Sequence, residues 1–247
     1  MEKNMKYDLT SFRRDLEEFH IQLNDEQEKQ FILFYEMLVE QNKVMNLTAI
    51  TDFDDVIKKH FVDSLSLVKA IPDLSSKKLS LIDVGTGAGF PGIPLKIAFP
   101  DLEITLLDSL QKRINFLNKV IISIPLNGIR AIHGRAEDLA RPGKMREKFD
   151  LCVSRAVANL STLSEYCIPF VKNEGRFISY KSGGSEQEAA EAQRAVHILG
   201  GENPQVYSFF LPESDIARSL YVVKKKTPSP VKYPRKAGLP AKEPIHS

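Results

Sequence analysis

A glycine-rich loop follows directly on a short apolar run between Leu81 and Gly92, and this feature restricts the fold of the chain more than any other. Glycine tolerates positive φ and lets a ligand approach the backbone without a Cβ in between. The helix after such a loop points its N-terminus at the bound ligand. Pro91 and Pro94 suit the first turn of that helix, where a missing N–H costs least. The segment therefore predicts a strand, a ligand-binding loop and a helix in succession.

Short apolar runs alternate with helical patterns from this point on, which is typical of a parallel sheet covered by helices on both faces. The expected parallel strands are Leu79–Val84, Glu103–Asp108, Arg130–His133, Asp150–Ser154 and Arg176–Tyr180. The expected helices include Pro91–Ala98, Gln111–Ile122, Leu160–Val171 and Glu186–Leu199. Two final runs, Val206–Leu211 and Ser219–Val223, lack a linker long enough for a crossover helix, so we expect them to pair antiparallel. The fold class is therefore α/β, with a mostly parallel seven-stranded sheet.

Residues 1–75 are expected to form a helical extension packed on this core. Asn24 is followed three residues later by Gln27, which resembles a capping box at a helix start. Thr51 and Asp54 repeat that spacing and predict a further helix, with His60 on or near its apolar stripe. The apolar face of the first of these helices comprises Phe31, Phe34, Tyr35 and Leu38.

Composition excludes several classes of protein. Of 247 residues, 43% are hydrophobic and 27% are charged, as in ordinary globular chains. We find no run of roughly 18 apolar residues, the length that a membrane span needs, and no apolar signal segment at the start. The two cysteines show no paired metal-ligand spacing. We expect a soluble cytoplasmic protein without a metal.

A basic, proline-punctuated tail occupies residues 225–247, after a sheet domain at residues 76–224. From Lys224 onward there are seven basic residues against one acidic residue, Glu243, although the whole chain carries a net charge of only +2. Repeated prolines exclude a helix there. The charge suits a polyanion, and the alternative is a tail that serves solubility alone.

The glycine spacing fits two kinds of ligand. Gly87, Gly89 and Gly92 match the dinucleotide fingerprint G-x-G-x-x-G, which would indicate an NAD-dependent oxidoreductase. Gly85, however, occupies the strand end, and Asp83 places a carboxylate that would repel a pyrophosphate and suit a cation. A G-x-G-x-G loop after an acidic strand end resembles motif I of S-adenosylmethionine-dependent methyltransferases.

Acidic residues also follow the next two strands. Asp108 ends the second strand, where a carboxylate reaches the ribose hydroxyls of an adenosine ligand; the alternative is a helix cap. Ala136 and Glu137 follow the third strand, in the loop that flanks the adenine in this fold; the alternative is that Glu137 and Asp138 open a helix.

Several segments together resemble the glucose-inhibited division protein B family of bacterial methyltransferases. They are Asp83–Pro94, Leu107–Leu110, Arg135–Glu137, Ser154–Ala156, Asn46–Thr48, Lys59–His60, Asp63–Leu65 and Tyr233–Lys236. The resemblance implies a class I methyltransferase fold, Rossmann-like, with S-adenosylmethionine as cofactor and S-adenosylhomocysteine as product. It also implies methylation of N7 of a guanine in the 530 loop of 16S ribosomal RNA. The family's cofactor contacts fall on Gly85, Phe90, Ala136, Glu137 and Arg155, and the full expected cofactor set adds Asp83, Gly87 and Asp108.

Guanine N7 carries a lone pair and no proton, so its methylation is a direct in-line displacement that needs no general base. The place after the fourth strand reads Ser154-Arg155-Ala156-Val157, not the Asn/Asp-Pro-Pro-aromatic motif used on exocyclic amines. Cys152 and Cys167 fall in apolar elements and are expected to be core residues, not nucleophiles.

The expected catalytic residues are Arg155, Lys181 and His60. Arg155 and Lys181 follow the fourth and fifth strands at the ligand-binding edge, and we expect Arg155 to touch cofactor and base. We expect His60 to position groups in preference to transferring a proton. Lys181 binds RNA in this hypothesis, or is a plain surface lysine. The other expected RNA contacts are Lys224, Lys225, Lys226, Lys232, Tyr233, Arg235 and Lys236.

The expected partner is 16S ribosomal RNA or a small ribosomal subunit particle, bound by a monomer that does not contact a membrane. Deletion from Lys225 onward is expected to weaken RNA binding and flatten its salt dependence, with little effect on cofactor affinity. Besides the oxidoreductase, a non-catalytic ribosomal RNA-binding or assembly protein is the other alternative.

Overall fold

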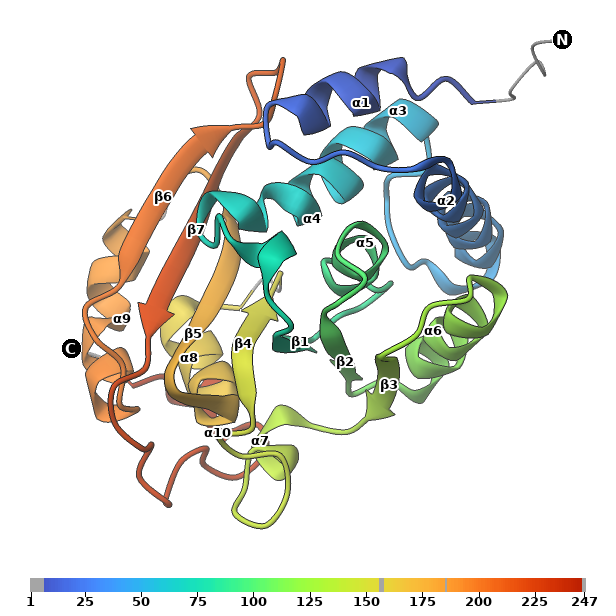
Figure 1. The fold of residues 1–247 in the computed structure, drawn as a ribbon. Coiled ribbons are helices and arrows are strands. Elements are labelled where there is room, and N and C mark those ends of the chain that lie inside the picture. Colours follow the sequence, from blue (N-terminus) through green and yellow to red (C-terminus); the bar gives the residue numbers. More distant parts are fainter. Residues whose placement is uncertain (1–6, 156–157, 185, 246–247) are drawn as a thin grey trace, which may run out of the picture.

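The computed structural model describes residues 7–155, 158–184 and 186–245, which form one seven-stranded sheet with helices on both faces (Figure 1). The strand order is β3-β2-β1-β4-β5-β7-β6. The strands are β1 (Ser80–Val84), β2 (Glu103–Asp108), β3 (Ile129–His133), β4 (Phe149–Ser154), β5 (Val171–Ser182), β6 (Gln205–Phe210) and β7 (Ala217–Lys224). The first five strands are parallel, and β7 pairs antiparallel with both β5 and β6. This confirms the predicted sheet, including its antiparallel final pair.

The helices form two layers. Figure 1 shows α2 (Asp25–Met45), α4 (Asp63–Leu65), α5 (Gly92–Ala98) and α6 (Gln111–Ser123) on one side of the sheet. On the other side lie α7 (Ala136–Leu139), α8 (Leu160–Cys167), α9 (Glu186–Ile198) and α10 (Leu239–Lys242). Parallel strands need apolar side chains on both faces, and each layer here covers one apolar cluster.

One predicted helix is too long. The helix expected over Leu160–Val171 ends at Cys167 and continues as the 3-10 segment η4 (Ile168–Phe170). Pro169 lacks a backbone N–H and cannot extend an α-helix. Val171 already belongs to β5, which therefore begins five residues before the predicted Arg176.

The N-terminal region is helical, as predicted. It contains α1 (Thr10–Glu17), α2, α3 (Phe53–Val56), the π-helical η1 (Ile57–Val62), α4, η2 (Ser66–Lys69) and η3 (Leu74–Ser76). The capping box is confirmed, because Gln27 N donates to Asn24 Oδ1 and Asn24 N donates to Gln27 Oε1, both at 2.9 Å. The helix start predicted at Thr51 is wrong by one residue, since Asp52 accepts from Asp55 N at 3.1 Å and caps α3.

The extension has no core of its own. Phe31, Phe34 and Phe61 belong to the same apolar cluster as side chains of β1, β2 and β4. An aromatic stack crosses from Phe34 to Phe61 at 5.7 Å and on to Phe90 of the glycine loop at 6.1 Å between ring centroids. The extension therefore supports the loop that follows β1.

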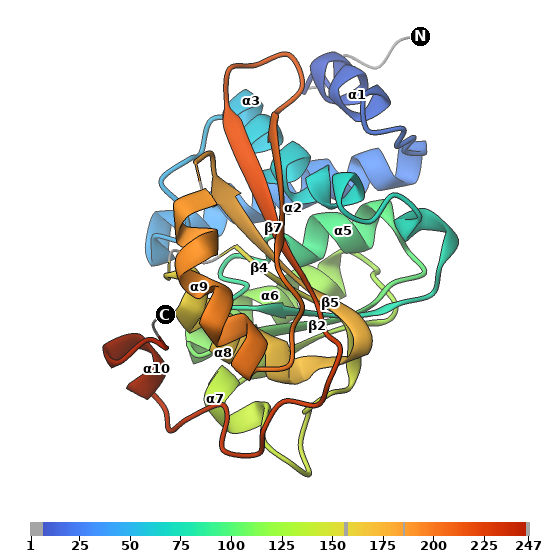
Figure 2. The ribbon, with the colours of Figure 1, turned by 90° about the vertical axis from the view of Figure 1, so that its left-hand side faces the viewer.

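The tail is folded against the core, and the expectation that its prolines exclude a helix is wrong. The short helix α10 begins with Leu239-Pro240, and a proline in the first turn removes an N–H that has no helical partner anyway. Figure 2 shows the tail running from the end of β7 past α7 to α10, which lies beside α8. In the described part of the chain, no helix is long and apolar enough to cross a bilayer.

Candidate cofactor and substrate site

The glycine loop between β1 and α5 turns through left-handed backbone. Gly85, Gly87 and Gly89 have φ values of 74°, 61° and 102°, which residues with a Cβ rarely adopt. Gly85 N donates to Leu107 O of β2 at 2.8 Å, so the loop begins while still attached to the sheet. The positive φ at Gly85 explains why a glycine, and not a residue with a Cβ, stands at the end of the strand.

The loop glycines differ in what surrounds them. A Cβ on Gly92 would meet Leu106 Cδ2 at 2.3 Å, and one on Gly89 would meet Ile93 Cδ1 at 2.5 Å. These two glycines therefore permit close packing of α5. A Cβ on Gly87 would meet only Gly85 O, at 4.0 Å, so open space lies beside Gly87. A ligand can therefore approach the loop at Gly87. At Gly89 and Gly92 the corresponding space is occupied by neighbouring side chains.

Asp83 lies beneath this loop and is fully buried. Its Oδ2 accepts from Thr86 Oγ1 at 2.7 Å and from Gly92 N at 2.9 Å. Its Oδ1 is buried without a hydrogen-bond partner among the described residues. Burial raises the pKa of Asp83 to about 7, against the lowering effect of these two hydrogen bonds. The carboxyl group thus holds the loop through Thr86 and Gly92, and an acidic side chain beneath the loop disfavours a phosphate there.

Asp108 ends β2 and is nearly buried. Its Oδ1 accepts from Leu110 N at 2.9 Å, and its Oδ2 accepts from Gly87 N at 3.0 Å and Arg113 Nη1 at 3.2 Å. A carboxylate offers about four acceptor positions, so one is left for a ligand hydroxyl. Asp108 therefore fixes the glycine loop and is not the N-cap of α6, which is Leu110; its contact with a ligand ribose stays a prediction.

Ala136 and Glu137 begin α7, directly after β3 and its loop. Glu137 is 5% exposed, and its Oε1 accepts from Gly238 N of the tail at 2.9 Å. Gly134 N donates to Asp108 O at 3.0 Å, so this loop lies against the end of β2. The expected adenine-side residues are therefore next to Asp108, at the carboxyl ends of the parallel strands.

Arg155 follows β4 and joins the glycine loop to the extension. Its guanidinium lies 4.9 Å from the centroid of the Phe90 ring, and its Nη1 donates to Asp63 Oδ2 at 2.9 Å. Asp63 Oδ1 accepts in turn from Arg218 Nε of β7 at 2.9 Å. Asp63 thus holds two arginines from different strands at fixed positions.

His60 is enclosed and hydrogen-bonded at both ring nitrogens. Its Nε2 lies 2.9 Å from Thr48 Oγ1 and its Nδ1 lies 3.1 Å from Lys59 O, while its ring packs on Phe90 at 4.7 Å. Burial, with the positive charge of Arg155, lowers the pKa of His60 to about 4. The imidazole is therefore neutral near pH 7, and its surroundings favour a positioning role over proton transfer.

A cavity of about 680 Å³ opens beside Arg155. It is lined by side chains of both charges, with cations in excess: Lys59, Arg155, Lys181 and Arg218, with Asp63 and Glu188. Lys181 Nζ donates to Ala158 O and Glu188 Oε1, both at 2.9 Å, so it braces the loop after β4 as well as facing the cavity. Gly183 and Gly184, predicted to form a turn that admits RNA, lie on the rim.

Arg218 is a charged cavity residue that the sequence analysis missed. It pairs with Ser182 at the end of β5, because β7 runs antiparallel to the parallel strands and so begins where they end. The predicted antiparallel pairing was the available signal, since it places the start of the last strand at the ligand-binding edge.

Two of the basic residues expected to bind RNA are built into the fold. Lys225 is 1% exposed and its ammonium pairs with Glu147 at 2.8 Å. Arg235 forms hydrogen bonds of 3.0 and 2.7 Å with the buried carboxylate of Glu165. Lys225 therefore has almost no surface to offer RNA, whereas the expected contact of Arg235 with RNA stays a prediction.

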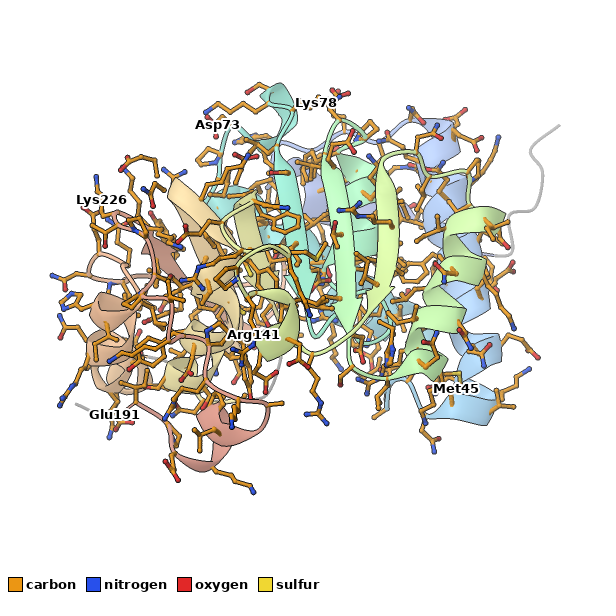
Figure 3. All side chains as sticks on the ribbon, turned by 90° about the horizontal axis from the view of Figure 1, so that it is seen from below. Met45, Asp73, Lys78, Arg141, Glu191 and Lys226 are labelled. Atoms are coloured by element: carbon orange, nitrogen blue, oxygen red, sulfur yellow. The ribbon has the colours of Figure 1, made fainter. Side chains whose placement is uncertain are left out.

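Lys224 and Lys226 lie far from the cavity. Both pair with Glu174, and Lys224 is in register with Arg176 near the start of β5. Figure 3 shows Lys226 toward the same end of the molecule as Lys78, which precedes β1. They lie at the amino ends of the parallel strands, a place that does not support a contact with RNA bound at the cavity. Lys232 and Lys236 are exposed.

Comparison with known proteins identifies the family. The model of the family described as rRNA small subunit methyltransferase G matches residues 27–217. A relative of that name from Lachnoclostridium phytofermentans is 50% identical over 238 residues, covering 96% of this chain and 98% of its own length. The chain belongs to this family. Another relative of the same name, from Acetivibrio thermocellus, is 50% identical over 227 residues and covers 92% of each chain.

Membership of the rRNA small subunit methyltransferase G family confirms the resemblance to the glucose-inhibited division protein B family. The family motif after β4 is described here only as far as Arg155, because Ala156 and Val157 lie outside the described residues. The remaining motif segments surround the glycine loop and the cavity.

Solved structures confirm the fold class. A predicted O-methyltransferase from Agrobacterium tumefaciens is similar with a TM-score of 0.53 and 16% identity, covering 69% of this chain and 82% of that chain. TYW2 of M. jannaschii, in complex with AdoMet, has a TM-score of 0.51 and 14% identity, with 66% and 75% covered. At this identity the likeness shows the fold alone, a class I methyltransferase sheet with helices on both faces.

Proposed function

We propose that this chain transfers a methyl group from S-adenosylmethionine to N7 of a guanine in the 530 loop of 16S ribosomal RNA. The observation that carries the proposal is a glycine loop at the carboxyl ends of the parallel strands that is open at Gly87 and held by the acidic side chains of Asp83 and Asp108. This site suits a cationic ligand, and S-adenosylmethionine carries a sulfonium and an amino group. The names of the relatives support ribosomal RNA as the substrate.

The residues present fit this cofactor. Gly85 and Gly87 would lie against it, Asp83 would face its positive charge, and Asp108 would accept from a ribose hydroxyl. Ala136 and Glu137 would flank the adenine, and Phe90 would supply apolar contact. When bound, the cofactor supplies an electrophilic methyl group.

The cavity residues would orient the guanine. Arg155 lies between the glycine loop and the cavity, so it would contact both cofactor and base. Lys181 and Arg218 would bind RNA phosphate or base, while neutral His60 would hold the Phe90 ring and the Lys59 backbone in place. Because N7 carries no proton, these residues need only bind and align the base, and alignment lowers the barrier by about 7–11 kcal/mol.

In the C-terminal tail, Lys232 and Lys236 are exposed and would extend the proposed RNA surface, together with the half-buried Tyr233 between them. The oxidoreductase alternative is less well supported. Side chains packed around α5 occupy the space beside Gly89 and Gly92, and the acidic side chain of Asp83 opposes a pyrophosphate.

Isothermal titration with S-adenosylmethionine and, separately, with NADH tests the cofactor assignment. We expect saturable binding of S-adenosylmethionine and no measurable binding of NADH. The reverse result would contradict the proposal and favour the oxidoreductase.

A further inference from the structure

The C-terminal strap, residues 227–245, joins the end of the sheet remote from the cavity to the loop expected to hold the adenine. It leaves β7 after Lys224, at the amino ends of the parallel strands, and reaches Glu137 at their carboxyl ends. Figure 2 shows it passing α7 before it ends at α10 beside α8. Beyond its hydrogen bonds with Gly200, Glu147 and Leu199 near its start, three further sets of polar contacts hold it along this path.

The first contact is made by Arg146, in the loop between α7 and β4. Its guanidinium donates to four backbone carbonyls: Ala140 O at 3.2 Å, Tyr233 O at 2.8 Å, Pro230 O at 3.2 Å and Ser229 O. Three of these carbonyls belong to the strap. A planar guanidinium with five N–H groups can hold a backbone segment through several carbonyls in this way, without a carboxylate partner.

The second contact pairs Arg235 of the strap with Glu165 of α8. Glu165 is fully buried, and it accepts from the backbone N of Arg235 at 2.7 Å as well as from the guanidinium. A buried carboxylate is stable only with such donors. The pair therefore fixes the strap's course three residues before Gly238.

The third contact reaches the cofactor loop. Gly238 N donates to Glu137 Oε1 at 2.9 Å, and Thr162 Oγ1 donates to Pro240 O at 3.1 Å. Gly238 has a φ of 82°, which suits glycine, so the turn that aims this N–H at Glu137 is encoded in the sequence. Glu137 and its neighbour Ala136 are the residues proposed to flank the adenine.

We propose that the strap is a positioning element for the cofactor site: its docking through Gly238 sets the position of Ala136 and Glu137 in the first turn of α7, so strap docking and cofactor binding stabilise each other. The inference rests on the proposed function, because it takes S-adenosylmethionine and its product as the ligands. The proposal gives the tail a role in cofactor binding, whereas the sequence analysis expected the tail to act on RNA with little effect on cofactor affinity.

The test compares full-length protein with a variant that lacks residues 238–247. This deletion removes the Gly238 contact and α10, and it keeps Arg146 and the Arg235–Glu165 pair. We expect the truncated protein to bind S-adenosylhomocysteine at least about five-fold more weakly by titration calorimetry, the lower end of ordinary coupling between sites. The matched control, Lys242→Ala, changes an exposed side chain of α10 and is expected to bind as the full-length protein does.

Hydrogen exchange of the full-length protein gives a second reading that does not depend on how the variant folds. Coupling is reciprocal, so S-adenosylhomocysteine is expected to slow exchange of the backbone amides of residues 235–243. A purely structural strap would exchange at the same rate with and without the ligand. Binding by the truncated protein within two-fold of full-length would overturn the inference, and so would unchanged exchange. Failure of the full-length protein to bind S-adenosylmethionine or its product would instead refute the proposed function itself.

Discussion

Arg155 connects three parts of the site at the scale of single residues. It stacks on Phe90 of the glycine loop, pairs with Asp63 of the extension and lines the cavity. Its position after the fourth strand could be predicted, because carboxyl ends of parallel strands share one edge of the sheet. Its pairing with Asp63 could not, because 92 residues separate the two in sequence.

Arg155→Ala is expected to reduce turnover by about 10²–10³-fold, comparable to the loss of one preorganised donor in an active site. The reason is that the variant loses both the contact with Phe90 and a donor facing the base. Steady-state kinetics on small-subunit RNA measures the effect. Cys152→Ser is the control on the same strand: it buries a hydroxyl, so it lowers stability by about 1–3 kcal/mol and leaves turnover unchanged. Wild-type turnover in Arg155→Ala would remove this residue from the mechanism.

Asp83 gives a prediction that depends on pH. Its pKa of about 7 in the folded protein lies above its ordinary value of 3.8, so folding favours the protonated form. The resulting stabilisation is complete below pH 3.8 and is lost as the pH rises through 7. Asp83→Asn can still accept from Thr86 and Gly92 but does not titrate. The unfolding free energy of the variant, relative to wild type, should therefore increase between pH 4 and 8 by on the order of 2–4 kcal/mol.

Urea unfolding at several pH values measures this difference. Parallel pH profiles for Asp83→Asn and wild type would show that Asp83 is ionised throughout, and would contradict the assignment of a buried, partly unpartnered carboxylate.

At the scale of elements, the extension and the sheet share one core. Helix and strand periods predicted most elements, because apolar residues recur at the spacing each element imposes. The ends of elements were less predictable where a proline interrupts a helix directly before a strand, as at Pro169 and Val171. The π-helical turn η1, which carries His60, has no sequence signal, because its geometry depends on packing against the helices α1, α3 and α4.

Phe61→Ala tests whether the extension folds independently. Phe61 is fully buried between Phe34 and Phe90. Removing its ring should lower the unfolding free energy by about 3–5 kcal/mol, and the protein should still unfold in one transition. Phe61→Leu should cost less, since it conserves more volume. Two separate transitions, by circular dichroism and by fluorescence, would indicate that residues 1–75 form a domain of their own.

At the scale of the whole molecule, the tail is the part that sequence reasoning described least well. A count of charges along residues 225–247 shows an unpaired basic segment. The acids that neutralise it, Glu147 and Glu165, precede their partners by 78 and 70 residues. Only the folded chain brings them together, so local composition could not distinguish a docked strap from a free tail.

Lys232 and Lys236 are the exposed lysines of the strap that are still proposed to bind RNA. Replacing both with Ala should weaken RNA binding and reduce the slope of log affinity against log salt by about 1.4, since each phosphate contact with single-stranded nucleic acid contributes about 0.7. Fluorescence anisotropy across a salt series measures the slope. Lys224→Ala with Lys226→Ala is the matched control at the other end of the sheet, and its slope should equal that of wild type. Equal slopes for both double variants would remove the strap from the RNA surface.

Mapping the methyl group on 16S ribosomal RNA tests the proposed activity most directly. Small-subunit RNA or particles from cells lacking this protein are incubated with the purified chain and S-adenosylmethionine, and the RNA is digested and sequenced by mass spectrometry. We predict one added methyl group, at N7 of a guanine in the 530 loop. Transfer to an exocyclic amine or another loop, or no transfer to either RNA or particles, would contradict the proposed activity.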